Sequence, residues 1–295
     1  MIFFFSIFDK TLILNIMKKI IIVCSLLVTV VCFSQNKQKV KGSKIVKIEQ
    51  KQIDEFETLE VQDNLDISLF KGSQSAVEIE ADDNLIPFVE CTLEGKNLKI
   101  STSKAISSYK KLSVRVTYTD NFNMLIAKDE TNITVLADLI LDTITFKCYD
   151  NTKLFLNAKT KNFVLLANDK TKTELNLKSE KTTIETSKNA QLKALVSSDE
   201  MKFDMYQKSF AELEGDVIDL KLRLDNNTDF TGRKLTAKNA TLEVGGYTKT
   251  SIIVSENLSI DASGDSEIEL YGNPLKIEIK NFKDTSTLRK KQIKK

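Results

Sequence analysis

From about residue 130 onward, apolar and polar residues alternate in short runs that polar turns separate. In the stretch "DNTKLFLN", Leu154 and Leu156 follow a polar run, and Leu175 and Leu177 follow the next such polar run in the same way. The first apolar residues of such runs are Ile133, Leu154, Leu175, Leu192, Leu213, Phe230, Ile252 and Ile268. Their spacings are 21, 21, 17, 21, 17, 22 and 16 residues, so the chain repeats a unit of about 19 residues.

A second set of alternating runs lies between the first set, at residues 144–148, 163–167, 203–205, 218–224, 242–244 and 258–262. The clearest is "IDLKLRL", which would place Ile218, Leu220, Leu222 and Leu224 on one face. Two short strands per repeat of about 20 residues are typical of a β-solenoid, because each coil buries its apolar row only against its neighbours. The pattern predicts an all-β, right-handed parallel β-helix of about seven or eight coils. An antiparallel sandwich with evenly spaced strands is the alternative.

Before the repeats, the pattern predicts strands at about 56–62, 66–70, 76–80, 91–94, 97–101 and 112–119. We expect this β-rich portion to cap the solenoid, because an open first coil would expose unpaired strand edges. In the coils, the inward row should include Leu154, Leu175, Leu220, Leu222, Ile260 and Ile268, and turns are expected at Asp150, Asp169, Asp225 and Asp265. Outward residues repeat along parallel lines and are therefore the candidates for an extended binding face.

Residues 1–34 have the pattern of a signal peptide. Lys18 and Lys19 precede the apolar run 20–31, and "VCFSQN" supplies small residues for cleavage after Ser34. Met17 is the expected translation start, since a complete signal follows it. The apolar run is short for a membrane span, and Val31 is not the small residue that lipid attachment at Cys32 requires. The sequence predicts an exported protein of the periplasm or cell surface, without a stable membrane span after cleavage.

Charge divides the remaining chain into a basic linker at 35–52, a solenoid domain at 53–282 and a basic tail at 283–295. Residues 35–52 carry six Lys and one Glu, and residues 280–295 carry seven basic residues and one Asp. The body between them has 27 basic and 38 acidic groups, a net charge of −11. An acidic body argues against a nucleic-acid partner.

The residues offer little for catalysis, and we expect no catalytic, cofactor-binding or metal-binding residues and no cofactor. The sequence contains no His, no phosphate-binding Gly loop and no CxxC pair. Asp-rich turns lack the spacing of known calcium loops. Asp225 with Arg223 and Asp229 with Arg233 are interpreted as outward-facing charges. Two further features stay open: whether Cys91 and Cys148 are buried thiols or a disulfide, and whether Tyr149, Tyr206, Tyr247 and Tyr271 form a contact stripe or pack over the coil.

Several motifs resemble the exported head GIN domain family, whose members are described as autotransporter adhesins. These motifs are "AVEIEADDNLIPFVE", then "EGKNLKI", then alternating strands, and finally "LYGNPLKI" at 270–277. The resemblance covers about residues 45–290. The turns depart from it, because only "ASGDSEIEL" keeps the Gly-rich loops of the family. Asn and Asp tolerate left-handed backbone nearly as Gly does, so the turns can survive the exchange.

The resemblance implies a non-enzymatic envelope or surface protein, an adhesin or binding scaffold that presents a repetitive solenoid face. Its partner would be an envelope or surface ligand, either glycan or protein. Two alternatives remain open. Parallel β-helix polysaccharide lyases and hydrolases share the architecture and work without His, but they carry long loops around a cleft. A self-assembling structural element would need an uncapped terminal coil.

Overall fold

The computed structural model of the chain describes residues 37–135 and 137–292. The predicted signal peptide lies outside these residues, and the described residues from Lys39 onward form one compact unit. In the described part of the chain, no helix is long and apolar enough to cross a membrane.

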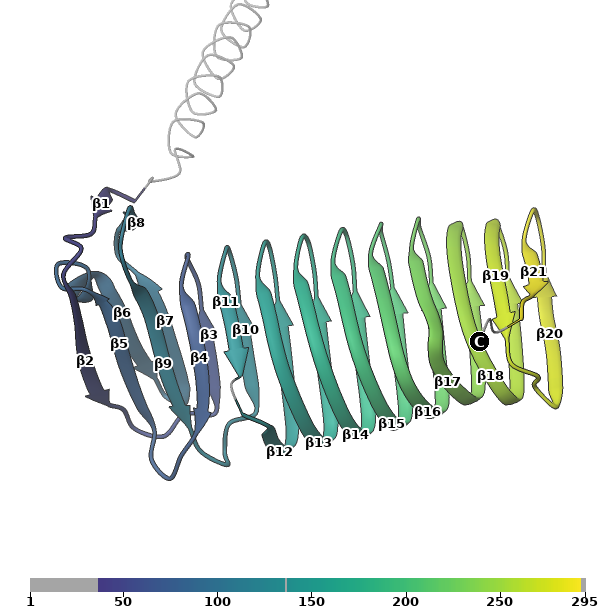
Figure 1. Cartoon of the computed structure of the whole chain (residues 1–295), viewed down its shortest axis with the longest axis horizontal. Coiled ribbons are helices and arrows are strands. Elements are labelled where there is room, and N and C mark those ends of the chain that lie inside the picture. The colour runs from purple at the N-terminus through teal and green to yellow at the C-terminus, as the bar shows by residue number, and fades with distance from the viewer. Residues whose placement is uncertain (1–36, 136, 293–295) are drawn as a thin grey trace, which may run out of the picture. The chain divides into compact units, whose positions relative to one another are not determined.

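The unit is a β-solenoid of about nine turns, with 69% of the described residues in strands (Figure 1). The all-β solenoid prediction is confirmed, and the expected number of seven or eight coils was slightly low. Strands pair in parallel from β3 and β4 to the last coil, which excludes the antiparallel sandwich. The first elements in chain order are β1 (Lys39–Lys41), β2 (Val46–Gln52), β3 (Thr58–Val61), β4 (Asp66–Lys71), β5 (Ala76–Asp82), the 3-10 helix η1 (Ile86–Phe88), β6 (Val89–Glu94), β7 (Asn97–Thr102), β8 (Ala105–Ser107) and β9 (Leu112–Tyr118).

The coils then follow one another along the solenoid. Their strands are β10 (Met124–Ala127), β11 (Asn132–Val135), β12 (Leu139–Cys148), β13 (Lys153–Ala167), β14 (Lys172–Thr186), β15 (Gln191–Met205), β16 (Phe210–Leu224), β17 (Asp229–Val244), β18 (Tyr247–Ala262), β19 (Asp265–Tyr271), β20 (Lys276–Phe282) and β21 (Thr287–Lys290). Each long strand bends once, and its two halves form separate ladders. The first halves continue the ladder of β4 and β11, here called face B, and the second halves continue that of β3 and β10, here called face A.

The structural repeat of most coils is about 19 residues, slightly shorter than the spacing between the leucine pairs at 154 and 175. Leu156 lies beside Leu175, whereas Leu154 lies beside Thr173. The first inward position of successive coils is taken by Leu154, Thr173, Leu192, Ala211, Phe230, Thr250 and Ile268. Where this position holds a small or hydroxylated residue, the first large apolar residue comes two positions later. This offset explains the alternation of long and short spacings.

The bend also interrupts the alternation of apolar and polar residues. Two successive residues point outward there, as in 199–200 and 218–219. Ile218 is therefore 46% exposed, while Leu220, Leu222 and Leu224 are buried, so the prediction of one continuous face was wrong at Ile218. The inward row predicted at Leu154, Leu175, Leu220, Leu222, Ile260 and Ile268 is confirmed, since each is at most 4% exposed.

An antiparallel portion closes the N-terminal end, in agreement with the predicted cap. On face B, β2 pairs antiparallel with β5 and β5 with β9, before β9 joins β4 in parallel. On face A, β6 pairs antiparallel with β7, and β7 joins β3 in parallel. The segments predicted as a basic linker and a basic tail contain the strands β2 and β21. Their lysines did not prevent pairing, because the ladder forms through the backbone.

The turns between faces A and B use left-handed residues that are mostly not glycine. Positive φ angles occur at Asp129 (61°), Asp150 (58°), Asp169 (63°), Lys188 (54°) and Asn226 (60°). The carboxylate of Asp150 also accepts the N–H of Asp129 at 3.0 Å, one coil away. Asp, Asn and Lys thus adopt the left-handed conformation that glycine most readily supplies, as the sequence suggested for Asp and Asn.

One buried carboxylate ties the first residues of the unit to the cap. Asp82 accepts N–H groups of Lys44 at 2.8 Å, Lys110 at 3.1 Å and Lys111 at 3.0 Å. Burial raises the pKa of this carboxyl group, but the three backbone N–H groups outweigh burial and hold the pKa below its ordinary value. The charged form is therefore the one that the folded state favours.

Asp82→Asn should lower the melting temperature at pH 6 by several degrees, because a charged acceptor of three N–H groups is lost. A folded pKa below the unfolded one stabilises the protein above the unfolded pKa, and this contribution is lost as pH falls through the folded pKa. The difference between variant and parent should thus shrink by pH 3. Thermal unfolding at both pH values measures it, with exposed Asp54→Asn as control. A difference that is independent of pH would contradict the assignment.

Candidate binding groove on face A

A groove of about 600 Å³ runs across face A between β14 and β20. It begins where each strand bends, because the first residue after the bend points outward beside the corner. Six such residues, one per coil, form the first row of the groove: Lys181, Glu200, Asp219, Asn239, Asn257 and Lys276. The next outward position gives a second row: Thr183, Lys202, Lys221, Thr241, Ser259 and Glu278.

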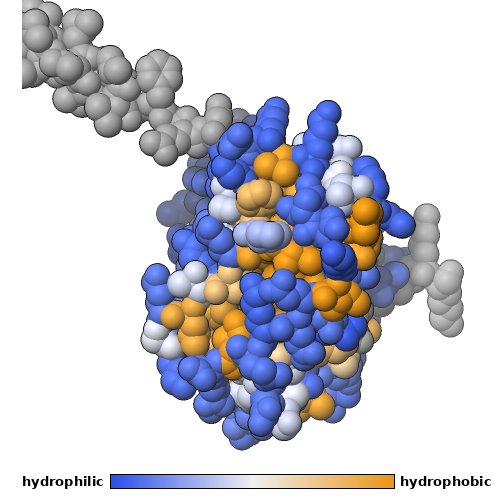
Figure 2. All heavy atoms as spheres, turned by 90° about the vertical axis from the view of Figure 1, so that its left-hand side faces the viewer, coloured by the Kyte–Doolittle hydropathy of each residue, from blue (hydrophilic) through white to orange (hydrophobic). Residues whose placement is uncertain are grey.

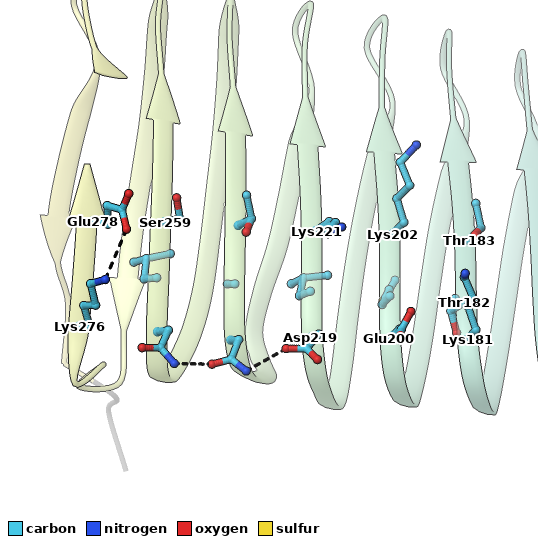
Figure 3. Close-up of a pocket in the computed structure, with 17 residues that line it drawn as sticks. Lys181, Thr182, Thr183, Glu200, Lys202, Asp219, Lys221, Ser259, Lys276 and Glu278 are labelled. Atoms are coloured by element: carbon cyan, nitrogen blue, oxygen red, sulfur yellow. Dashed lines mark hydrogen bonds and ion pairs between the residues drawn. The ribbon is translucent and has the colours of Figure 1, made fainter. Parts of the chain in front are cut away.

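Side-chain amides link the middle of the first row. Asn239 donates its Nδ2–H to Oδ1 of Asp219 at 2.8 Å, and Asn257 donates to Oδ1 of Asn239 at 2.7 Å (Figure 3). This ladder holds three polar side chains in fixed positions on adjacent strands, and each amide keeps further hydrogen-bonding capacity. The ladder is therefore a preorganised set of donors and acceptors.

The lysines of the groove fall into two groups. Lys202 lies 2.8 Å from Asp204, whose hydrogen bond raises the pKa of the lysine, and Lys276 lies 3.5 Å from Glu278. Lys181 and Lys221, in contrast, form no ion pair within 4 Å among the described residues, although Lys181 lies in register beside Glu200. Two unpaired cations beside an amide ladder favour a ligand that carries negative charge as well as hydroxyl or carbonyl groups.

None of these rows stands out in the sequence by residue type alone. Their residues are Lys, Glu, Asp, Asn, Thr and Ser, which by themselves look like ordinary surface residues. The usable signal was their recurrence: each follows the previous one after about 19 residues, and each residue of the first row stands directly behind another outward residue. This recurrence becomes visible only when the register between the coils is known.

Arg233 and Arg223, considered above beside Asp229 and Asp225, each have another partner in the structure. Arg233 contacts Glu269 at 3.0 Å, and Lys291 contacts the same carboxylate at 3.3 Å. Burial raises the pKa of Asp229 although the charges of Lys249 and Arg233 act in the opposite direction. Arg223 lies over the ring of Tyr206 at 5.7 Å. In the described residues, no group of three or more His, Cys, Asp or Glu side chains could hold a metal ion.

The four tyrosines do not form one stripe. Tyr149 and Tyr206 occupy the same turn position, but Asn168 and Ser187 stand in the two coils between them. Tyr247 lies in the first half of β18, and Tyr271 ends β19, so both belong to face B.

The two cysteines that the structure describes are free thiols. They lie in one inward row, Cys91 on β6 and Cys148 on β12, with Ile100, Val61 and Ala127 between them. Four strand spacings separate them by roughly 19 Å, which is too far for a disulfide. Complete burial raises the pKa of Cys148 to about 12, so it stays a thiol at neutral pH.

Parallel coils with an open polar groove on one outer face define a β-solenoid protein. The family described as "Putative auto-transporter adhesin, head GIN domain" matches residues 55–274, and the chain belongs to this family. A search of the curated proteins found no match.

Solved structures show the same fold at low sequence identity. A putative adhesin from Parabacteroides merdae has 14% identity and a TM-score of 0.63, over 86% of this chain and 99% of that one. A putative adhesin from Parabacteroides distasonis has 16% identity and a TM-score of 0.61, over 86% and 98%. A putative lipid binding protein from Parabacteroides distasonis has 12% identity and a TM-score of 0.58, over 86% and 99%. The family and these neighbours are named as adhesins or binding proteins.

Proposed function

We propose that the chain is a non-enzymatic, exported binding protein that holds an extended acidic glycan along the face A groove. The observation that carries this proposal is the combination of the amide ladder with the unpaired Lys181 and Lys221. Carboxylate or phosphate groups of the glycan would contact the lysines, and its hydroxyl groups would bond to the amides. The adhesin and binding names of the family and its neighbours support a binding role.

The proposal includes delivery to the periplasm or the cell surface after cleavage behind Ser34. The residue pattern of a signal peptide supports it, and so does the family's description as an auto-transporter adhesin. The partner is therefore a component of the envelope or of an encountered surface, not a nucleic acid.

The double variant Lys181→Ala/Lys221→Ala should weaken binding to polygalacturonate, a carboxylated polysaccharide, by about tenfold, since exposed ion pairs contribute ~0.2–1 kcal/mol each. Titration calorimetry at low salt measures the change, and binding should fall as salt rises. The matched control is Lys153→Ala/Lys172→Ala, two exposed lysines on face B. If the control lost as much affinity as the groove variant, the groove would not be the site.

One observation favours a second candidate, a glycan-cleaving enzyme. Glu200 and Asp219 lie on adjacent strands in direct register within the groove, so two carboxylates stand side by side. Glycosidases use carboxylate pairs, but their two groups flank the scissile bond. Here both belong to one row, and Asp219 is already engaged by Asn239. Release of new reducing ends that Glu200→Gln abolishes would establish this candidate instead.

A further inference from the structure

The C-terminal end of the solenoid exposes residues that are buried in every preceding coil. Ile277, Ile279 and Phe282 of β20 stack on Leu258, Ile260 and Ala262 of β18, which are at most 2% exposed. The β20 residues are themselves 46%, 52% and 40% exposed, and the preceding Leu275 is 86% exposed. An apolar row thus faces outward along the axis of the solenoid.

The same end carries open strand edges. Among the described residues, β20 pairs with β18 alone and β21 with β19 alone, so each has one edge without a neighbour. An unpaired edge beside apolar side chains is a template for adding another strand.

On face B, the N-terminal end is protected against such addition. On β2, Lys47, Glu49 and Lys51 lie opposite the inward residues Ala81, Ile79 and Val77 of β5, so their charges face the interior side of the sheet. Lys51 and Glu49 form an ion pair at 3.3 Å. Figure 2 shows this end, where hydrophilic side chains surround the apolar patches. Inward-pointing charges on an edge strand oppose edge-to-edge pairing, and β20 has only apolar residues at the corresponding positions.

We propose that β20 pairs antiparallel with β20 of a second copy, giving a tail-to-tail dimer with twofold symmetry. With Ile277 opposite its own copy, Lys276 of each chain lies opposite Glu278 of the other, and Leu275 lies opposite Ile279. Outward positions thus pair opposite charges, inward positions pair apolar groups, and the same patch serves both copies. Moving the centre to Glu278 would instead place like charges opposite each other, and moving it to Ile279 would place the apolar Ile277 opposite Asn281, so the first register is favoured.

Head-to-tail stacking is disfavoured by the other end of the molecule. On face B it would bring β21 against β2 and bury the inward-pointing charges of β2 together with Lys290, which lies opposite the buried Leu270. The twofold arrangement avoids this cost and leaves the charged N-terminal ends in solvent. The proposal does not depend on what the groove binds.

The test is the mass of the purified protein by sedimentation equilibrium, without added ligand. We expect twice the mass of one chain. Ile279→Lys should raise the dissociation constant at least about tenfold, because it places an inward charge on the edge. The matched control is Ile48→Lys, an isoleucine 63% exposed on β2, which should leave the dimer intact. Far-UV circular dichroism of each variant verifies the β-fold.

A charge exchange distinguishes self-pairing from any other occupant. Lys276→Glu should weaken the dimer by placing Glu opposite Glu278, and Lys276→Glu/Glu278→Lys should restore it, because both partners are exchanged together. A monomeric parent protein would overturn the proposal. The proposal would also be overturned if the dimer of Lys276→Glu/Glu278→Lys were as weak as that of Lys276→Glu. A monomer that binds anionic phospholipid vesicles through Ile279 would overturn it as well. A monomeric protein would not contradict the proposal of glycan binding, because that proposal is tested separately by titration with polygalacturonate.

Discussion

Phe203→Ala should lower the free energy of unfolding by roughly 3–5 kcal/mol, as expected for removing a fully buried aromatic side chain. Phe203 is 0% exposed in a central coil, and its ring lies 6.0 Å from that of Phe230 in an edge-on arrangement. Neighbouring coils on both sides fix the backbone, so the cavity cannot collapse freely. The lost free energy therefore has two parts: the transfer free energy of the buried ring and the cost of the cavity that it leaves.

Phe155→Ala is the matched control, since Phe155 points outward from β13 and is 36% exposed. It should change stability by less than about 1 kcal/mol. Urea unfolding of both variants, followed by circular dichroism, measures the difference. Equal costs would mean that Phe203 is not in the core and that the assignment of inward and outward rows is wrong.

Gly215→Ala should be at least as damaging, with a cost of roughly 3 kcal/mol or more from strain and steric clash together. Gly215 lies within β16 at a φ angle of 111°, which side chains rarely adopt. A Cβ atom there would collide with the carbonyl oxygen of Val196 and lie 3.0 Å from its carbonyl carbon. The obstacle is backbone of the adjacent coil, which cannot move aside without breaking the ladder.

Gly95→Ala separates backbone strain from steric clash. Gly95 also has a positive φ angle, 61°, but a Cβ atom there would meet nothing within 4 Å. The expected cost is only the roughly 1–2 kcal/mol of left-handed backbone. Thermal unfolding compares the two alanine variants. If the two variants had the same melting temperature, close packing of the coils would not be the reason why Gly215 cannot carry a side chain.

Much of the fold could be predicted because alternation of apolar and polar residues reports directly on which side chains face inward. The strands of the cap, from β3 to β9, fall close to their predicted positions, with β8 missed. The register could not be predicted from apolar residues alone, because Thr173, Ala211 and Thr250 occupy inward positions. The strands β2 and β21 were missed because their sequences are rich in charge, whereas pairing depends on the backbone.

The groove could not be predicted from the sequence. It joins one residue from each of six coils, and those residues become neighbours only when the successive coils are placed in register. Whether Lys181 and Lys221 form ion pairs depends on where the nearby carboxylates lie in the folded protein. Lys202, for example, forms an ion pair with Asp204. The open edge of β20 was not predicted either. The sequence indicated only that self-assembly would require an uncapped terminal coil.

The central claim is that face A binds an acidic glycan without cleaving it. One sample tests it: polygalacturonate is titrated into the protein by calorimetry at low salt, and the recovered polymer is assayed for new reducing ends and for unsaturated ends. We predict saturable binding, weakened about tenfold in Lys181→Ala/Lys221→Ala, with polymer length unchanged. New chain ends that grow with protein concentration, or binding that the groove variant leaves unchanged, would contradict the claim.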